Sequence, residues 1–156
     1  MTPQERNKAF VREAMEQFFN RHDLTAPDRL YAPDFVQHNA RVAALARAEG
    51  LTNLESVTRF FAGFFQAFPD YRVEIEHLAA EDDKVFVVCN WFGTHRGPFL
   101  GVPATGRAIR VRTAEVLRIE GGRIAEHWDV EDQLDLLLAL GLLQETQPIA
   151  PEATPQ

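Results

Sequence analysis

The 156-residue chain contains almost no cysteine and almost no lysine. Cys89 is the single cysteine, which excludes disulfide frameworks within the chain and thiolate-zinc clusters. The only lysines are Lys8, in a polar part of an expected helix, and Lys84, beside an expected turn. Neither is placed to become a desolvated Schiff-base lysine. Neither common glycine-rich phosphate loop occurs in the sequence.

Long apolar runs and an excess of positive charge are also missing. No stretch approaches the ~20 apolar residues that cross a bilayer, and the polar first ten residues lack the apolar core of a signal peptide. The chain has 23 acidic against 16 basic residues and a net charge of −7, whereas nucleic acids and anionic membranes attract clustered positive charge. We therefore expect a cytoplasmic protein with neither a nucleic-acid nor a membrane partner.

The composition is that of an ordinary folded domain. Apolar residues make up 46% of the chain, and a chain of this length can bury a hydrophobic core without disulfides or metals. One domain is expected over residues 1–144. Residues 145–156 contain several prolines and are expected to form a disordered tail.

Helix start signals precede three segments in the first half of the chain. Capping boxes begin at Thr2 and Thr52, and a similar signal at Thr25 predicts a short helix between them. Pro69 ends the third helix. The Ala- and Arg-rich segment 41–50 fits either a loop or a weak helix.

After Pro69 the spacing of apolar residues changes from helical to alternating, which indicates strands. The expected strands lie near 71–75, 85–95, 108–119 and 123–130, and a closing helix lies around 132–140. Helices followed by an antiparallel meander are typical of an α+β fold. We expect the N-terminal helices to pack on the concave face of a curved antiparallel sheet, with an incompletely filled space between them that holds a ligand.

The strand at 108–119 places one carboxylate on a largely apolar face. Glu115 alternates with Val111, Thr113 and Leu117 on that face. Burying a carboxylate costs several kcal/mol unless it is paired or protonated. Two interpretations remain open: a salt bridge to an arginine at the rim of the sheet, or an acid that lines the pocket.

Two further titratable residues lie near strand ends. His95 ends the apolar row that contains Trp91, and is either a hydrogen-bonded structural residue or a donor that orients a ligand. Asp129 is either the N-cap of the closing helix or an acid in the pocket. Ile124, Trp128 and Val130 share the apolar side, which would place His127 and Asp129 on the opposite face. Alternation still leaves the choice open, because both faces of the strand can be buried in a cone whose concave interior is a pocket.

A metal site is not expected. His38, His95, His127 and Asp129 could supply two histidines and one carboxylate, but the histidines are dispersed and lack a ligand spacing such as HExxH. The phenylalanines of the third helix, among them Phe61 and Phe65, are expected in the core, with some rings lining the pocket.

Five motifs run through the chain: DFVQHN at 34–39, FPD at 68–70, GTHRG at 93–97, GVPATGR at 101–107 and GGRIAEHWD at 121–129. Together they resemble the SnoaL-like polyketide cyclases, also called ester cyclases, of the nuclear-transport-factor-2-like superfamily. The resemblance covers about residues 5 to 143. It implies a cone of three helices against a strongly curved antiparallel sheet.

The resemblance also implies a reaction. The characterised cyclases of this family close a ring of an aromatic polyketide by intramolecular aldol condensation, without metal or cofactor, and one aspartate serves as acid and base. That aspartate matches Asp129, whereas the histidine of the family pattern on the preceding strand falls at Glu115. The resemblance further implies a homodimer that pairs through the outer sheet face, which carries Arg110, Arg112 and Arg118.

We therefore expect the protein to act on a small hydrophobic or aromatic organic substrate without a cofactor. Asp129 would move the proton, with Glu115 and His95 as the other catalytic candidates. The expected substrate contacts are His38, Trp91, Phe61, Phe65 and His127. Dehydration, isomerisation or epoxide hydrolysis in the same pocket is the alternative within enzymes, and a non-catalytic protein that binds a hydrophobic ligand is the alternative outside them.

Overall fold

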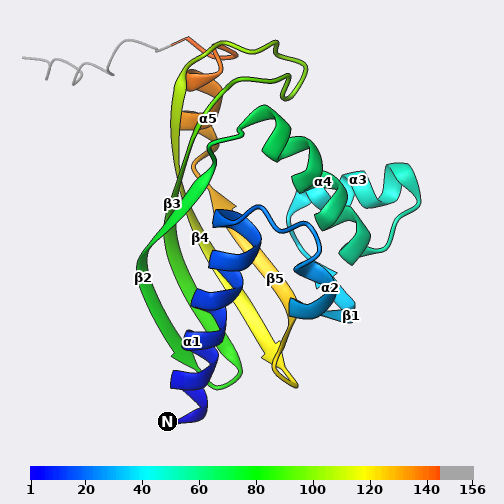
Figure 1. Ribbon diagram of the computed structural model, residues 1–156, viewed down its shortest axis with the longest axis vertical. Helices are drawn as coiled ribbons and strands as arrows, with labels where there is room; N and C mark the ends of the chain where they lie inside the picture. The colour runs from blue at the N-terminus through cyan, green and yellow to red at the C-terminus, as the bar shows by residue number, and fades with distance from the viewer. Residues whose placement is uncertain (145–156) are drawn as a thin grey trace, which may run out of the picture.

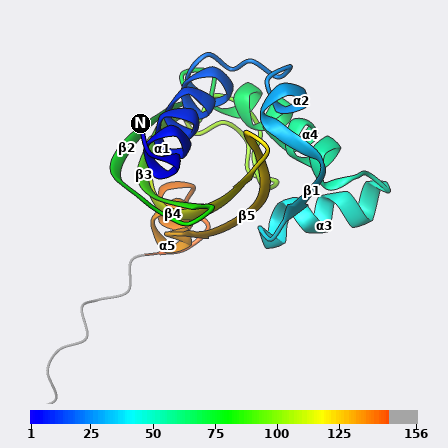
Figure 2. The same cartoon turned by 90° about the horizontal axis from the view of Figure 1, so that it is seen from below.

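In the computed structural model, helices from the first half of the chain cover one face of a curved five-stranded sheet (Figure 1). The structure describes residues 1–144, and the tail expected at 145–156 lies outside the described residues. Seen from below, the sheet curls around an interior that α1, α2 and α4 close on the other side (Figure 2). The expected α+β class, with N-terminal helices on the concave face, is confirmed.

The capping boxes start helices where the sequence predicts them. Thr2 caps α1 (Pro3–Met15) and Thr52 caps α4 (Asn53–Ala67). Each threonine hydroxyl accepts a hydrogen bond from the backbone N–H of the glutamate at the third helical position, and the carboxylate of that glutamate accepts one from the backbone N–H of the threonine. The chain continues from α1 through a π-helical turn at Glu16–Asn20 to the short α2 (Pro27–Leu30). The segment left open by the sequence is a helix, α3 (Ala40–Glu49), which Asn39 caps. No described helix is long and apolar enough to cross a membrane.

The sheet contains one strand in addition to the expected meander, formed where the sequence predicts a brief extended segment at 34–38. Its order is β1-β5-β4-β3-β2. The strands are β1 (Tyr31–Gln37), β2 (Arg72–Glu81), β3 (Lys84–Thr94), β4 (Ala108–Glu120) and β5 (Arg123–Glu131). The last four pair antiparallel as expected, but β1 pairs parallel with β5, so the sheet is mixed. This edge strand brings the DFVQHN motif next to the C-terminal half of β5.

An irregularity in the pairing of β4 with β5 decides which β5 residues face the interior. Ile119 pairs with Ile124 but Arg118 pairs with Glu126, so Ala125 is an extra residue in β5. A β-bulge of this kind reverses the alternation of side chains that follow it. Ile124, His127 and Asp129 therefore all face the cavity. The prediction that Ile124 shares a face with Trp128 and Val130 is wrong.

Aromatic rings fill the space between α4 and the sheet. Phe64 lies 5.4 Å from Trp91 and 4.9 Å from Phe68 between ring centroids, and Phe61 lies 5.1 Å from Phe18 of the first helical segment. These are normal separations for stabilising aromatic pairs. The aromatic cluster forms the apolar wall against which the interior cavity is built.

The closing helix α5 (Gln133–Ala139) is capped by Asp132, whose side chain accepts a hydrogen bond from the backbone N–H of Asp135. The interpretation that Asp129 caps this helix is therefore wrong. Asp129 lies inside β5, three residues before the cap. Its carboxylate is free of a capping role.

Candidate active site

A cavity of about 90 Å³ lies between the helices and the concave face of the sheet. Its apolar wall comes from α1, its π-helical extension, α4, β3 and α5, and includes Phe18, Phe61, Phe64, Trp91 and Leu136. Its polar wall comes from the β1–α3 junction, β4 and β5: Gln37, Asn39, Arg41, Thr113, Glu115, His127, Asp129 and Glu131. A mostly apolar cavity with a few converging polar groups is the usual form of a small-molecule site.

Glu115 and Asp129 belong to this one cavity. They are direct cross-strand partners in the pairing of β4 with β5, and both line the cavity. Side chains directly opposite each other on one face of an antiparallel pair have Cβ atoms ~4.5–5.5 Å apart. Two carboxylates are thus held side by side, although their hydrogen-bond partners differ.

Asp129 accepts a single side-chain hydrogen bond, from the amide nitrogen of Asn39 at 2.7 Å. The carbonyl oxygen of the same Asn39 side chain accepts from the backbone N–H groups of Arg41 and Val42, both at 3.0 Å. Asn39 is thereby fixed at the start of α3 with its amide directed at the carboxylate. The other oxygen of Asp129 has no side-chain donor among residues 1–144 and remains accessible to a ligand proton.

Glu115 faces His127. One carboxylate oxygen lies 3.4 Å from His127 Nε2, and the other accepts from Thr113 Oγ1 at 3.1 Å and from Cys89 Sγ at 3.4 Å. Burial raises the pKa of the Glu115 carboxyl, but the hydrogen bond and charge of His127, with the Cys89 and Thr113 bonds, bring it below its ordinary value. Glu115 is therefore a pocket-lining acid whose ionic partner is a histidine, and the interpretation of a salt bridge to an arginine is wrong.

Both ring nitrogens of His127 face a polar partner. Nδ1 lies 2.8 Å from the side-chain oxygen of Gln37 and Nε2 faces Glu115. Burial lowers the pKa of the imidazole, but the hydrogen bond and charge of Glu115, followed by the charges of Asp129 and Glu131, raise it above its ordinary value. Each partner therefore favours the charged form of the other.

Glu131 is the third carboxylate of the polar wall. Arg41 of α3 approaches it at 3.7 Å, and its Oε2 is buried with no hydrogen-bond partner in the described part of the chain. Burial raises the pKa of Glu131, Arg41 lowers it, and the neighbouring Asp129 and Glu115 raise it further. The polar wall therefore gathers three acidic side chains around one imidazole and one guanidinium.

Trp91 and Phe61 line the cavity as predicted for substrate contacts, whereas Phe65 and His38 do not. Phe65 packs in the core and stacks on His22 with ring centroids 4.2 Å apart. His38 is exposed; its Nε2 is 2.8 Å from Glu126 and its ring stacks on Trp128, which lines a different groove. Neither reaches the polar wall.

His95 lies away from the cavity, at the root of the loop between β3 and β4. Its Nδ1 is 3.0 Å from the hydroxyl of Thr105, and its backbone exchanges hydrogen bonds with Gly106 and Arg107. The ring is fully buried and stacks on Phe68. These contacts support the structural interpretation of His95, and the structure does not bring it to Asp129 as a catalytic partner.

Five residues of the polar wall were not among the predicted site residues: Gln37, Asn39, Arg41, Thr113 and Glu131. Gln37 and Asn39 belong to the DFVQHN motif, so the motif itself was the available signal. The pairing of β1 with β5 brings them to the site. Within residues 1–144, no three His, Cys, Asp or Glu side chains converge closely enough to hold one metal ion.

The fold and this site agree with one protein family. The profile of the SnoaL-like polyketide cyclases matches residues 9–140. The chain therefore belongs to the SnoaL-like polyketide cyclase family. No curated protein matches the sequence significantly.

Solved structures of similar proteins share the fold over most of the chain. AclR from Streptomyces galilaeus, described as a candidate hydroxylase, is 28% identical with a TM-score of 0.78, over 94% of this chain and 87% of AclR. TsrD from Streptomyces laurentii is 28% identical with a TM-score of 0.74, over 87% of this chain and 98% of TsrD. IdmH from Streptomyces antibioticus, a candidate polyketide cyclase, is 29% identical with a TM-score of 0.73, over 86% of this chain and 98% of IdmH.

Proposed function

We propose that this protein closes a ring in a polyketide-like substrate by intramolecular aldol condensation, with Asp129 as acid and base. One observation carries the proposal. Asp129 faces a mostly apolar cavity from the middle of a strand, with no capping role and with a single side-chain hydrogen bond, to Asn39. A carboxylate held in this way is positioned to exchange a proton with a bound ligand.

The chemistry suits an acidic substrate carbon. A carbon flanked by two carbonyls, or by a carbonyl and an aryl ring, needs only a modest base. Asp129 would take its proton, and the enolate carbon would attack an electrophilic carbonyl of the same molecule. The aromatic wall that includes Phe61, Phe64 and Trp91 would hold the flat apolar part of the substrate and exclude water. The proposed substrate is therefore a small hydrophobic or aromatic molecule, and no cofactor takes part.

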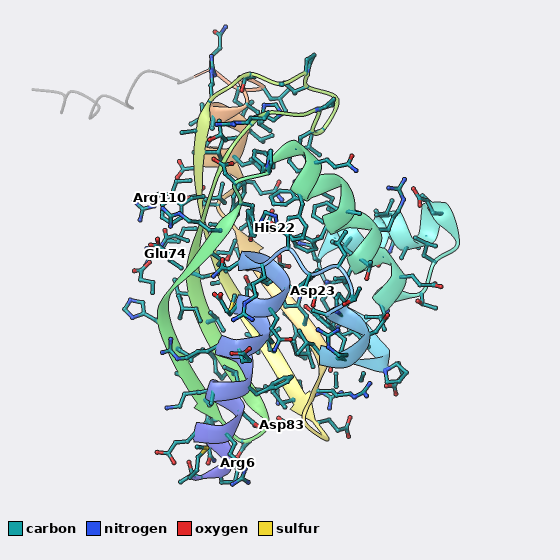
Figure 3. The ribbon with its side chains drawn as sticks, in the orientation of Figure 1. Arg6, His22, Asp23, Glu74, Asp83 and Arg110 are labelled. Carbon is teal, nitrogen blue, oxygen red and sulfur yellow. The ribbon has the colours of Figure 1, made fainter. Side chains whose placement is uncertain are left out.

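We also propose that the protein is a homodimer. The outer face of the sheet carries an apolar groove that includes Phe86, Val88, Val116, Trp128 and Val130, and Val130 is 74% exposed. Charged side chains continue the same face beyond the groove, and Figure 3 shows Glu74 and Arg110 on this outer side, away from the helices. A second copy of the chain is the expected occupant.

Replacement of Asp129 by asparagine tests the reaction. The amide introduced by Asp129→Asn can still accept the hydrogen bond of Asn39 but cannot carry the proton, so turnover of an aromatic polyketide ester with an activated methylene should fall by ~10²–10⁴, with thermal stability unchanged. Asp132→Ala is the matched control: it removes the true cap of α5 and should cost about 1 kcal/mol of stability without a comparable loss of turnover. Near-wild-type turnover by Asp129→Asn would exclude Asp129 from the chemistry and favour a dehydratase, isomerase, epoxide hydrolase or ligand-binding role.

A further inference from the structure

The protonation of His127 is fixed by its neighbours. The side-chain oxygen of Gln37 accepts a hydrogen bond from the backbone N–H of Asn39 at 3.0 Å and lies 2.8 Å from His127 Nδ1. A backbone N–H is always a donor, so the Gln37 atom that it contacts is the acceptor oxygen, and the imidazole nitrogen that shares this oxygen must carry a proton. Gln37 is itself buried. Nδ1 of His127 is therefore protonated and is not the nitrogen that exchanges a proton.

The second nitrogen of His127 faces the cavity acid Glu115. A neutral ring with its proton on Nδ1 would present a lone pair from Nε2 to the Glu115 carboxylate, 3.4 Å away, which is repulsive. A proton on Nε2 turns this repulsion into an ion pair. The distance is long for a charge-assisted hydrogen bond, so the Nε2 proton is not fully committed to Glu115 and can be shared with a ligand oxygen in the cavity that both residues line.

The charged surroundings of His127 favour the cationic form of the ring. Glu115 reaches it from β4, and Asp129 and Glu131 act on it from its own strand. Arg41 of α3 pairs with Glu131 at 3.7 Å. The remaining titratable groups that line this cavity are Cys89, Tyr31 and Tyr71, and burial raises the pKa of each well above neutrality, so they stay uncharged. Three acidic side chains thus lie around one imidazole.

We propose that His127 is a second catalytic residue, the acid that protonates the oxygen of the attacked carbonyl, and that Glu115 and Gln37 are positioning residues that act through it. This inference rests on the proposed aldol reaction and divides its proton transfers: Asp129 takes the proton of the activated carbon, and His127 rather than Asp129 gives a proton to the carbonyl oxygen. It reverses the roles expected from the sequence, in which Glu115 is catalytic and His127 only contacts the substrate. His127 and Asp129 lie two positions apart on the same face of β5, so a base and an acid flank the same ligand.

The proposed step balances. The Asp129 carboxylate takes the proton of the activated carbon, a C–C bond forms between that carbon and the carbonyl carbon, and the carbonyl π electrons move to oxygen. The oxygen takes the Nε2 proton of His127 and becomes a hydroxyl. The new hydroxyl then takes the proton held by Asp129 and gives its own proton to Nε2 of His127. The Glu115 carboxylate favours this reprotonation of His127, because a neutral ring would direct the Nε2 lone pair at the carboxylate. The enzyme is then restored, and the product is an isomer of the substrate.

The experiment compares pH profiles and the NMR titration of His127. Glu115→Gln keeps the shape of the side chain but removes the charge, so the His127 imidazolium should deprotonate at lower pH. The alkaline limb of turnover and the His127 titration should both move to lower pH in this variant, and His127→Gln should lose ~10²–10⁴ of turnover while remaining folded. Glu126→Gln is the control, since it removes the partner of His38 at 2.8 Å, outside the cavity, and should move neither readout.

Gln37→Leu tests the contact at Nδ1, the other ring nitrogen of His127. Loss of the acceptor removes the partner of Nδ1–H, and ¹⁵N chemical shifts should show the neutral ring gaining the Nε2–H tautomer at high pH. The readouts separate the two proposals. An inactive Asp129→Asn with an active His127→Gln, or with a Glu115→Gln profile that does not move, overturns the role of His127 and leaves the proposed function standing. A fully active Asp129→Asn overturns the proposed function and the aldol step together, whatever the NMR titration shows.

Discussion

Asn39 and Asp129, 90 positions apart in the sequence, are joined by a hydrogen bond of 2.7 Å from the side-chain amide to the carboxylate. The other end of the Asn39 side chain caps α3. One residue therefore links the start of a helix to the candidate catalytic acid. The position of α3 and the orientation of the Asp129 carboxylate are coupled through it.

Substitutions of Asn39 should separate the cap from the catalytic contact. Serine caps helices about as well as asparagine but has no amide to offer Asp129, so Asn39→Ser should keep stability and lose about tenfold or more in turnover, the equivalent of one hydrogen bond to a charged group. Asn39→Ala should lose turnover equally and about 1 kcal/mol of stability besides. Steady-state turnover and thermal melts measure the two effects. Thr52→Ala removes the cap of α4 instead and should affect stability alone; equal turnover in Asn39→Ser and wild type would contradict the coupling.

The Glu115–His127 pair predicts a pH dependence of stability. The folded pKa of Glu115 is below its ordinary 4.5, so its contribution is present above that value and is lost as pH falls through the folded pKa. The folded pKa of His127 is above its ordinary 6.5, so its contribution is complete below 6.5 and is lost as pH rises through the folded pKa. The stability difference between wild type and Glu115→Gln should therefore be largest between pH 4.5 and 6.5.

Denaturant melts across about pH 4 to 9 measure this difference. It should shrink toward both ends of the range. Glu74→Gln is the control, because Glu74 forms an ion pair with Arg72 at the exposed outer face, where such pairs contribute ~0–1 kcal/mol. A Glu115→Gln difference that stays constant with pH would show that the two groups do not titrate as a pair.

Gly97 should tolerate no side chain. A Cβ at this position would lie 2.8 Å from the backbone oxygen of Gln66 and 3.1 Å from Ala67 Cα, and both atoms belong to the backbone of α4. Gly97→Ala should therefore displace the loop between β3 and β4 and cost about 1–3 kcal/mol. Gly63→Ala, inside α4 with open space around the added methyl, should instead stabilise by up to about 1 kcal/mol. Thermal melts of the two variants give the comparison, and equal stability of both would contradict this close approach.

The proposed homodimer predicts a sensitive position on the outer sheet face. Val130 is 74% exposed at the apolar groove, and a lysine there would place a charge in the proposed contact between subunits. Val130→Lys should give a monomer by light scattering at micromolar concentration, with the fold retained. Leu134→Lys, at a 59% exposed position on α5, should leave the dimer intact. A wild-type protein that is already monomeric would refute the proposal.

The sequence determined the features that depend on neighbours a few residues away. The capping boxes at Thr2 and Thr52 start α1 and α4, because a cap needs only its own first turn. Regular alternation along β4 was enough to place Glu115 on the inner face, where it lines the cavity. The family motifs indicated the family, which the profile match confirms.

The tertiary structure decided what depends on pairing between distant segments. The bulge at Ala125 reverses the alternation of β5 and turns His127 and Asp129 inward, and only the register against β4 specifies it. The parallel pairing of β1 with β5 brings Gln37 and Asn39 to the site. Local alternation holds only while a strand is regular, and one extra residue exchanges its two faces; the partner of each titratable group is therefore set by the sheet and not by the spacing of residues along the chain.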